Sequence, residues 1–436
     1  MKTTKVGLIG LGTVGIGTAR ILLEEGHLIR KKLGWPLVLK RIADLDLERS
    51  RGIQVDGDLL TTDAADILND PEIEIVVELI GGYEPAKTYI LKAIAAGKHV
   101  VTANKALLAT QGRDIFRAAS EAGVDVLFES SVGGGIPLIR SLKEGLPANH
   151  IRHFFGILNG TSNYILTKMT QEGMDFQQAL REAQNQGYAE ADPTFDVEGV
   201  DAAHKLVLLV SLAYGFQVTM DDIYREGIRQ LDPLDIRFAD EFGYVVKLLA
   251  ISSRSGDRIE ARLHPTMLPK GHLLTEVNGP FNAVHINGHA VGDILLYGAG
   301  AGMMPTASAV VGDVIELARG IHAGAPARVP ALGWWDAEAS DLQLMPMDEV
   351  QTRYYFRFSA VDRPGVLSII SGVLGQHDIS ISAVIQKGRE VHGAVPIVML
   401  THEARESSVR AALSEIDALE GVIKAETILI RVEERL

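Results

Sequence analysis

The sequence KVGLIGLGTVG, residues 5–15, places the glycine pattern GxGxxG directly between a predicted strand and a predicted helix. The apolar run before the first glycine predicts a buried strand, and a helical pattern follows from Val14 to about Lys32. In this pattern Gly10 permits a tight turn, Gly12 lets the backbone approach a pyrophosphate, and Gly15 lets the helix pack on the strand. The order of elements favours a dinucleotide-binding loop over an ordinary tight turn.

The helix start and the end of the next strand supply the other candidates for cofactor binding. Free N–H groups and a partial positive charge at a helix N-terminus suit phosphate groups. Asp44 follows the predicted strand 38–43, and its carboxylate would accept hydrogen bonds from the ribose hydroxyl groups of NAD. One of Arg41, Arg49 and Arg51 could instead bind the 2′-phosphate of NADP, so both cofactors remain open. The candidate residues in this region are Gly10, Gly12, Thr13, Val14, Gly15 and Asp44.

Predicted strands and helices alternate through the first 130 residues. Strands are expected at 73–80, 99–102 and 124–128, with helices at 86–96 and 105–122. Such alternation is typical of a parallel, doubly wound sheet with helices on both faces. We therefore predict an NAD(P)-binding Rossmann domain, and we place it at residues 1–130.

The alternation stops at about residue 130. Strands are expected at 151–158, 258–264 and 283–286 among helical segments, with an apolar helix near 307–318. This α+β pattern predicts a separate domain for substrate binding, catalysis and dimerisation at residues 131–321. An Ala-, Pro- and Gly-rich stretch at residues 322–349 is predicted to be a linker. Several central strands have no predicted covering element, so we expect a homo-oligomer, either a dimer or a tetramer.

The last part of the chain, residues 350–436, reads as a compact unit of its own. A strand at 354–361 is followed by an amphipathic helix, two strands, a second amphipathic helix and a final strand at 423–432. This βαββαβ order is that of the ferredoxin-like fold. The predicted fold class is therefore a multidomain combination of α/β and α+β domains.

Composition excludes several classes of protein. The net charge of -14 argues against a nucleic-acid partner, because phosphate binding requires a basic surface. The chain has no cysteine, which excludes disulfides, thiolate metal sites and a cysteine nucleophile. The N-terminus has no signal-peptide pattern, and the longest apolar stretch, 206–213, is far shorter than the roughly 20 residues that span a bilayer. We expect a soluble, cytoplasmic protein.

Residues 183–205, AQNQGYAEADPTFDVEGVDAAHK, combine several carboxylates with a lysine at the start of an apolar helix. Asp201 and Lys205 are four residues apart and therefore share one face of that helix. The helix is apolar all round beyond Lys205, which predicts burial. A buried lysine needs a partner, and a lowered pKa would suit it as a proton donor. The alternative is a surface ion pair that caps a core helix; His204 is interpreted as structural.

The same segment resembles the signature of the homoserine dehydrogenase family. It matches that signature at Ala183, Gly187, Asp192, Pro193, Asp196, Gly199, Asp201 and Lys205. Residues 1–320 are similar to the family in their order of elements, including VVTANKALLA around Lys105. The resemblance implies NAD(P)-dependent interconversion of L-homoserine and L-aspartate 4-semialdehyde, in the biosynthesis of threonine, methionine and isoleucine. Because the first predicted strand begins the chain, we expect a monofunctional member with no fused kinase ahead of it.

The resemblance also implies roles for particular residues. Lys205 would be the acid–base residue, Asp201 and Glu190 would hold the substrate, and Lys105 would lie beside the substrate and the nicotinamide. These roles agree with the chemistry, since hydride transfer to an aldehyde builds negative charge that a lysine can stabilise and protonate. Two acidic groups can bind the substrate ammonium, and Lys105 can offset a negative charge. The backbone at Gly187 and Gly302 resembles positions that approach the nicotinamide half of the cofactor.

A further feature of the family is a monovalent cation site, for Na⁺ or K⁺, built largely of backbone carbonyl groups. The loop ESSVGGGI at residues 129–136 matches it. Oxygen ligands suit a hard cation. Without the resemblance, three glycines after a strand indicate only a flexible turn. The candidate ligands are Glu129, Val132, Gly134 and Ile136.

The sequence DRPGVL, which starts at Asp362, resembles the ligand loop of ACT domains, which commonly bind amino acids between two copies. Gly365 permits close approach of the backbone, and the helix start can accept a carboxylate. Asp362 and Gly365 are therefore candidate effector-binding residues. Threonine is the natural candidate effector, because it lies downstream of homoserine. The alternative is a module that only assists dimerisation.

Three other functions are alternatives to this one. Aspartate-semialdehyde dehydrogenase chemistry requires a thiolate, which this chain does not have. Other amino-acid or hydroxy-acid dehydrogenases share the Rossmann domain, but residues 183–205 do not resemble their catalytic segments. A non-catalytic sensor of nucleotide and amino acid is a different class. The Asp201–Lys205 pair separates the two classes, because only an enzyme would lose turnover without Lys205.

Overall fold

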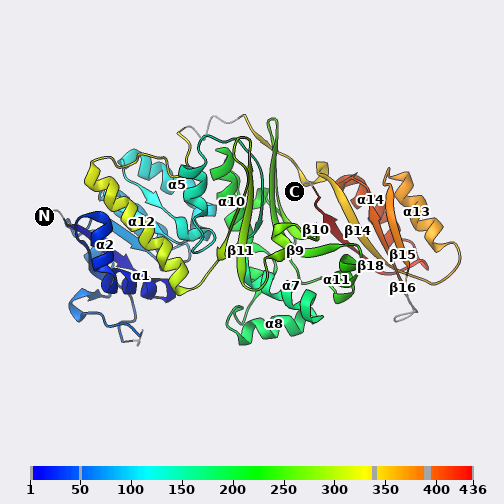
Figure 1. The fold of residues 1–436 in the computed structure, drawn as a ribbon, viewed down its shortest axis with the longest axis horizontal. Helices are drawn as coiled ribbons and strands as arrows, with labels where there is room; N and C mark the ends of the chain where they lie inside the picture. Colours follow the sequence, from blue (N-terminus) through cyan, green and yellow to red (C-terminus); the bar gives the residue numbers. More distant parts are fainter. Residues whose placement is uncertain (1–2, 49–51, 336–340, 387–393, 435–436) are drawn as a thin grey trace. The chain divides into compact units, whose positions relative to one another are not determined.

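The computed structural model describes residues 3–48, 52–335, 341–386 and 394–434 (Figure 1). Arg49 and Arg51 lie outside these residues. The chain forms two compact units, each assembled from segments far apart in sequence. The first unit comprises 1–160, 201–223 and 281–341, and the second comprises 161–200, 224–280 and 342–436.

The first unit contains a six-stranded sheet in the order β3-β2-β1-β4-β5-β6, and every pair of neighbouring strands is parallel. β1 is central, and the chain crosses to β2 on one side and to β4 on the other. The strand order therefore reverses at β1, where such sheets bind nucleotides. This confirms the predicted Rossmann-type sheet. The strands are β1 (Thr4–Ile9), β2 (Leu37–Ala43), β3 (Leu60–Thr61), β4 (Ile75–Glu78), β5 (His99–Thr102) and β6 (Val126–Leu127).

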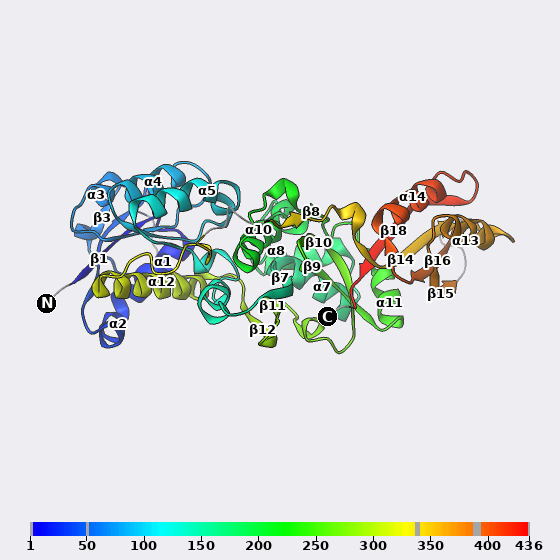
Figure 2. The ribbon, with the colours of Figure 1, turned by 90° about the horizontal axis from the view of Figure 1, so that it is seen from above.

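Helices cover both faces of this sheet (Figure 2). One face carries α1 (Thr13–Glu24), α2 (Gly26–Leu33) and α12 (Met303–Ala323), and the other carries α3 (Ala65–Leu68), α4 (Ala86–Ala95) and α5 (Lys105–Ala122). Two sequence predictions need correction here. The single helix expected at 14–32 is interrupted at Glu25, next to Gly26, because glycine is a poor helix former. The helix predicted at 307–318 is longer and belongs to this layer, where Val310 and Val314 share a core with Val6 and Leu8.

The first unit also contains three antiparallel strands and a buried helix. β7 (Ile151–Ile157) pairs with β11 (Phe281–Gly288), which pairs with β12 (Gly292–Ala299). Helix α10 (Val200–Tyr214) is buried at every residue from Asp201 onward, and the ring of Tyr214 stacks on Phe154 of β7. The sequence did not predict β12. Short segments of the same unit are 57–59, 129–131, α6 (Leu138–Arg140), 141–145 and 220–222.

The second unit contains strands in the order β9-β10-β18-β14-β16-β15. The strands are β9 (Tyr244–Ser255), β10 (Arg258–Pro269), β14 (Gln351–Ala360), β15 (Ile381–Gln386), β16 (Val395–Thr401) and β18 (Ile423–Val432), with short pairings by β8 (Tyr224–Arg225), β13 (Gln343–Leu344) and β17 (Ala404–Arg405). The helices are α7 (Gly160–Glu172), α8 (Phe176–Asn185), α9 (Thr194–Val197), α11 (Pro233–Glu241), α13 (Val366–Gln376) and α14 (Glu406–Asp417). The sequence did not predict β9, which is the antiparallel partner of β10 along its whole length.

The C-terminal elements follow the predicted βαββαβ order, β14-α13-β15-β16-α14-β18, and their strands lie in the ferredoxin-like arrangement. Alternate residues of β14 face opposite sides of the sheet. Tyr354, Phe356 and Phe358 belong to a core with residues of α13 and α14. Within the predicted linker at 322–349, α12 continues to Ala323 and β13 pairs with β10.

Among the residues that the structure describes, none of the helices has the length and apolarity required to cross a bilayer. This agrees with the short apolar stretches of the sequence.

A buried carboxylate joins α11 to the opposite face of β14. Asp235 is 0% exposed and accepts hydrogen bonds from Nε and Nη2 of Arg357, at 2.6 and 2.8 Å, and from the Tyr355 hydroxyl at 2.8 Å. Burial, followed by the Asp235 charge, raises the pKa of Tyr355 well above its usual value, so this hydroxyl remains a donor. Removing one partner of a buried ion pair leaves the other charge uncompensated.

We therefore expect Asp235→Ala to lower the free energy of unfolding by about 3 kcal/mol, the size typical of a broken buried pair. Asp240→Ala, on the same helix, removes the exposed pair with Lys270 and should change stability by less than about 1 kcal/mol. Urea unfolding monitored by circular dichroism measures both values. Equal effects from the two variants would contradict a structural role for the buried carboxylate.

Candidate active site

Helix α10 begins with a buried ion pair. Lys205 Nζ donates to Asp201 Oδ2 at 2.7 Å, and both side chains are 8% exposed. The two residues lie one helical turn apart, so their side chains meet on one face. The structure therefore excludes the alternative of a solvated surface pair. An ammonium group in this position is held in a fixed direction.

The carbonyl group of Leu158, at the end of β7, is the second partner of Lys205. Lys205 Nζ donates to this oxygen at 2.6 Å, and Asn282 Nδ2 on β11 donates to the same oxygen at 2.9 Å. Asn159 Nδ2 donates to Asp201 Oδ2 at 2.8 Å. Sequence reasoning missed both asparagines. The available signal was Asn159 directly after a predicted buried strand, where a polar side chain has to find a partner.

Lys105 completes the cluster from a different part of the chain. It is the first residue of α5, after Asn104, whose side chain accepts a hydrogen bond from Leu107 N and so caps the helix. Lys105 Nζ lies 3.1 Å from Asp201 Oδ1 and is 32% exposed. Burial alone would raise the pKa of Asp201, but the charges of Lys205 and Lys105 hold it well below its usual range. The cluster therefore carries two ammonium groups and one carboxylate.

The glycine loop after β1 has the geometry that a dinucleotide requires. Gly10 has a φ of +99°, which favours glycine, and a Cβ at Gly15 would lie 2.1 Å from the Gly10 carbonyl oxygen. A Cβ at Gly12 would have no atom within 4 Å, so this side of the Gly12 backbone is open to a pyrophosphate. Thr13 and Val14 form the first turn of α1. The residues present therefore fit the pyrophosphate of a nicotinamide dinucleotide.

A cavity of about 460 Å³ lies at the carboxyl ends of β1, β2 and β4. Gly10, Gly12 and Asp44 line it, together with Ile80 and Tyr89. Asp44 Oδ2 accepts a hydrogen bond from Leu11 N at 2.6 Å, which holds the carboxylate beside the glycine loop. Arg41, one of the three arginines predicted as alternative 2′-phosphate ligands, donates to the carbonyl group of Asp58.

Glu78 was missed by sequence reasoning. It is the last residue of β4 and is 0% exposed. Its carboxylate accepts hydrogen bonds from the Thr102 hydroxyl at 2.7 Å and from Ile80 N at 2.8 Å. Burial raises the pKa of Glu78. These bonds fix the ends of β4 and β5 relative to one another, and Lys105 follows β5 after two residues.

The remaining predicted residues are distributed over both units. Gly302 is the N-cap residue of α12 in the first unit. Glu190 and Gly187 belong to the second unit, in the loop between α8 and α9, where Gln184 Nε2 donates to the Glu190 carbonyl group at 3.0 Å. Glu190 is exposed. Within the first unit, the cluster around Asp201 contains Lys105 and Lys205.

The loop predicted to bind a cation, residues 129–136, is tightly folded and buried except at Gly135. Both carboxylate oxygens of Glu129 accept backbone hydrogen bonds, from Ile139 at 2.9 Å and from Arg140 at 2.7 Å. The carbonyl group of Ile136 accepts from Leu138 N, and a Cβ at Gly134 would lie 2.6 Å from the Gly300 backbone. Val132 is fully buried in the same loop.

The oxygen atoms of this loop show whether its residues suit a cation. The buried Ser130 hydroxyl has no hydrogen-bond partner among the described residues. This hydroxyl lies in the same turn as the backbone carbonyl groups of the loop. The potential ligands of the segment are therefore all oxygen atoms. This donor set fits a monovalent cation.

The predicted effector loop precedes α13. Gly365 is the N-cap residue of that helix with a φ of +90°, and Asp362 is exposed three residues earlier. The first turn of α13 therefore directs N–H groups toward this loop, and the first of them, Val366 N, donates to the Arg363 carbonyl group at 3.4 Å.

Comparisons with known proteins agree with this geometry. Residues 10–129 match the family model described as "Homoserine dehydrogenase, NAD binding domain", residues 137–315 match "Homoserine dehydrogenase", and residues 354–421 match "ACT domain". Homoserine dehydrogenase of Neisseria gonorrhoeae is 45% identical over 433 residues, which cover 99% of each chain.

Solved structures give the same result. The structure of a homoserine dehydrogenase from Thiobacillus denitrificans is 47% identical, with a TM-score of 0.93 and 99% of each chain covered. A hyperthermophilic archaeal homoserine dehydrogenase in complex with NADPH is 27% identical, with a TM-score of 0.62, and covers 72% of this chain and 98% of its own. From its sequence, its fold and these full-length matches, the chain belongs to the homoserine dehydrogenase family of NAD(P)-dependent oxidoreductases.

Proposed function

We propose that this chain interconverts L-homoserine and L-aspartate 4-semialdehyde with Lys205 as the acid–base residue. The observation that carries the proposal is the buried cluster in which Asp201 contacts both Lys205 and Lys105. This reaction belongs to the biosynthesis of threonine, methionine and isoleucine. The nicotinamide cofactor, when bound, supplies or accepts the hydride.

Side chains of the protein stabilise the charge on the substrate oxygen and transfer its proton. Addition of a hydride to the aldehyde carbon places a negative charge on its oxygen, and Lys205 Nζ donates a proton to that oxygen. In the opposite direction, Lys205 accepts the hydroxyl proton of homoserine. Asp201 and the Leu158 carbonyl group orient the ammonium group, so little reorganisation is needed during the reaction.

Three residues would bind the rest of the substrate. Asp201 and Glu190 would hold the substrate ammonium, and Lys105 would offset the carboxylate or the developing oxyanion. Lys105 is supported in this role by its 3.1 Å contact with Asp201 and by its partial exposure, which leaves the ammonium group accessible to a ligand. Backbone at Gly187 and Gly302 would approach the nicotinamide half of the cofactor.

We expect Lys205→Ala to lower kcat for homoserine-dependent reduction of NAD or NADP by roughly 10²–10⁴-fold, the range typical of a lost acid–base group. Binding of reduced cofactor, measured by fluorescence titration, should stay at the wild-type level. Lys92→Ala, an exposed lysine of α4, is the matched control and should retain full activity. Loss of cofactor binding together with turnover would indicate misfolding rather than a missing proton donor.

Wild-type protein that binds dinucleotide but shows no turnover with either cofactor would contradict the proposed reaction. The non-catalytic sensor would then be the better hypothesis.

For the cofactor, we propose a preference for NAD over NADP. The support is Asp44, whose carboxylate lines the cavity beside the glycine loop and would repel a 2′-phosphate. Arg41 is engaged with the Asp58 carbonyl group, which reduces its availability for a phosphate. The archaeal relative in complex with NADPH shows that the family also includes proteins that bind the phosphorylated cofactor.

We expect Asp44→Asn to lower the ratio of kcat/KM for NAD to that for NADP by about tenfold or more, because it removes a charge of the same sign as the phosphate. Asparagine retains one oxygen that can accept the hydrogen bond from Leu11 N, so the glycine loop should keep its shape, while the hydrogen bond from Asp46 N to the other carboxylate oxygen is lost. Steady-state kinetics with both cofactors measure the ratio. An unchanged ratio would show that another group sets the preference.

We also propose that the 129–136 loop binds Na⁺ or K⁺ through oxygens of Glu129, Val132, Gly134 and Ile136. The support is the set of hard oxygen donors in this loop, including the Ser130 hydroxyl described above. The loop contacts the Gly300 backbone, so a bound cation would hold the segment that leads to Gly302 and α12.

For regulation, we propose that threonine binds at the loop between β14 and α13 and inhibits the enzyme. The N-terminus of α13 offers N–H groups to the effector carboxylate, and Asp362 offers an acceptor to its ammonium. The family model for ACT domains covers this loop.

We expect threonine to inhibit the wild type and Asp362→Asn to raise the half-inhibitory concentration by about tenfold, the cost of one charge-assisted hydrogen bond. Activity without threonine should not change. Glu403→Ala, an exposed acid elsewhere in the same C-terminal unit, is the matched control. A wild-type enzyme that does not respond to threonine at any concentration would remove this effector.

From the sequence we propose domain bounds of 1–130, 131–321 and 350–436, with a linker at 322–349, although α12 of the second range packs on the sheet of the first. We further propose a cytoplasmic homo-oligomer, a dimer or a tetramer, in which ACT modules pair. A monomer by light scattering at micromolar concentration would contradict the oligomer.

A further inference from the structure

Three neighbouring strands of the first unit bring metal-ligating side chains to one face, away from the cluster around Asp201. His153 on β7 is the direct partner of Asn287 on β11, and Asn287 is the direct partner of Asp293 on β12. His285 lies two residues before Asn287 and therefore on the same face of β11. The register of the sheet thus places two imidazoles and one carboxylate side by side.

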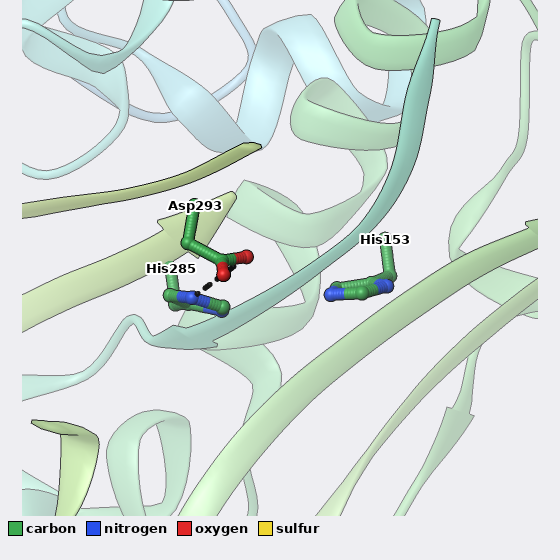
Figure 3. Close-up of side chains that lie close together, drawn as sticks. All are labelled: His153, His285 and Asp293. Carbon is green, nitrogen blue, oxygen red and sulfur yellow. Dashed lines mark ion pairs between the residues drawn. The ribbon is translucent and has the colours of Figure 1, made fainter. Parts of the chain in front are cut away.

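The distances between these groups are short enough for one ion. One potential ligand atom from each of His153, His285 and Asp293 lies within 4.8 Å of the other two. His285 Nε2 is 3.4 Å from Asp293 Oδ1, and the two imidazole rings have centroids 6.2 Å apart at 27°. Figure 3 shows the His153 ring on β7 facing the His285–Asp293 pair, which a dashed line joins.

We propose that His153, His285 and Asp293 form a site for a divalent transition-metal ion, Zn²⁺ in particular. Two imidazole nitrogens and one carboxylate oxygen are ligands that zinc accepts, with water in the fourth position. The site differs in chemistry from the oxygen-only loop at residues 129–136. The bound ion cross-links β7, β11 and β12.

The surroundings of the three ligands suit this role. His285 is 5% exposed, so its imidazole is held in a fixed position within the sheet. The Asp293 side chain is 65% exposed, which gives an ion access from solvent. Asn287 Nδ2 donates to Asp293 Oδ1 at 2.6 Å and orients the carboxylate, as outer partners of metal ligands commonly do.

The test is a titration of the untagged, metal-free full chain with Zn²⁺ alone, followed by calorimetry and by metal analysis after dialysis. We expect one equivalent per chain, and a rise in the unfolding temperature because the ion binds only the folded strands. Co²⁺ in place of Zn²⁺ should give the visible absorption bands of a four-coordinate site with nitrogen and oxygen ligands. None of these readouts depends on turnover.

Two variants identify the ligands. His285→Ala and the exposed Asp293→Asn should each weaken Zn²⁺ binding by at least about tenfold, and both should abolish the cobalt bands. The asparagine variant keeps the shape of the side chain, so it tests the site even if the buried histidine variant fails to fold. His289→Ala is the matched control, because this exposed histidine follows the same strand and its ring packs on His150 instead.

The results that would overturn the proposal are distinct. One is the absence of stoichiometric Zn²⁺ binding by the folded wild type. Another is binding that survives Asp293→Asn unchanged, and a third is binding that is lost in His289→Ala. The last two would place the ion at other side chains of the protein.

Discussion

The burial of the Asp201 carboxylate is the constraint on which the active site depends. A carboxylate that is 8% exposed remains ionised only if cationic groups and hydrogen-bond donors surround it. Lys205 comes from the same helix, Lys105 from the start of α5, and Asn159 from the turn after β7. Asn282 on β11 joins the same network through the Leu158 carbonyl group. The Asp201 carboxylate thus brings these four segments together, and their contacts fix the direction of the Lys205 ammonium group.

The parallel sheet supplies the second half of the site. Its strand order reverses at β1, and the cavity at the carboxyl ends of β1, β2 and β4 lies where the glycine loop begins. Glu78 holds the end of β4 against Thr102 at the end of β5, and Lys105 follows β5 after two residues. The strand ends that form the dinucleotide cavity are thus connected by hydrogen bonds to the segment that carries a candidate catalytic lysine.

In the second unit, buried charges connect the C-terminal module to the loops that carry part of the family signature. Arg431 on β18 is 0% exposed and contacts Glu226, beside β8, at 2.9 Å, as well as Glu406 on α14. Burial would raise the pKa of Glu226, but Arg431 holds it below its usual value. Two residues after Glu226, Ile228 N donates to the Val197 carbonyl group of α9. These contacts run from the ACT strands to the segment between Glu190 and Gly199.

The sequence by itself determined the local features, because they depend on short-range rules. Glycine spacing after an apolar strand predicted the loop at Gly10, alternation of elements predicted the parallel sheet, and a four-residue spacing put Asp201 and Lys205 on one helix face. The order of the last six elements likewise predicted their fold.

Tertiary structure decided the features that depend on residues distant in sequence. Examples are the packing of α12 onto the Rossmann sheet, the contact of Lys105 with Asp201, and the hydrogen bonds donated by Asn159 and Asn282. Each joins segments that are distant in sequence, and the local pattern of one segment does not predict its contact with the other. The row of His153, Asn287 and Asp293 depends on the register of three strands, and one of these strands, β12, was not predicted. The register is set by how the strands pair in space, and the local sequence pattern of one strand does not predict which residue of its neighbour lies opposite each of its own residues.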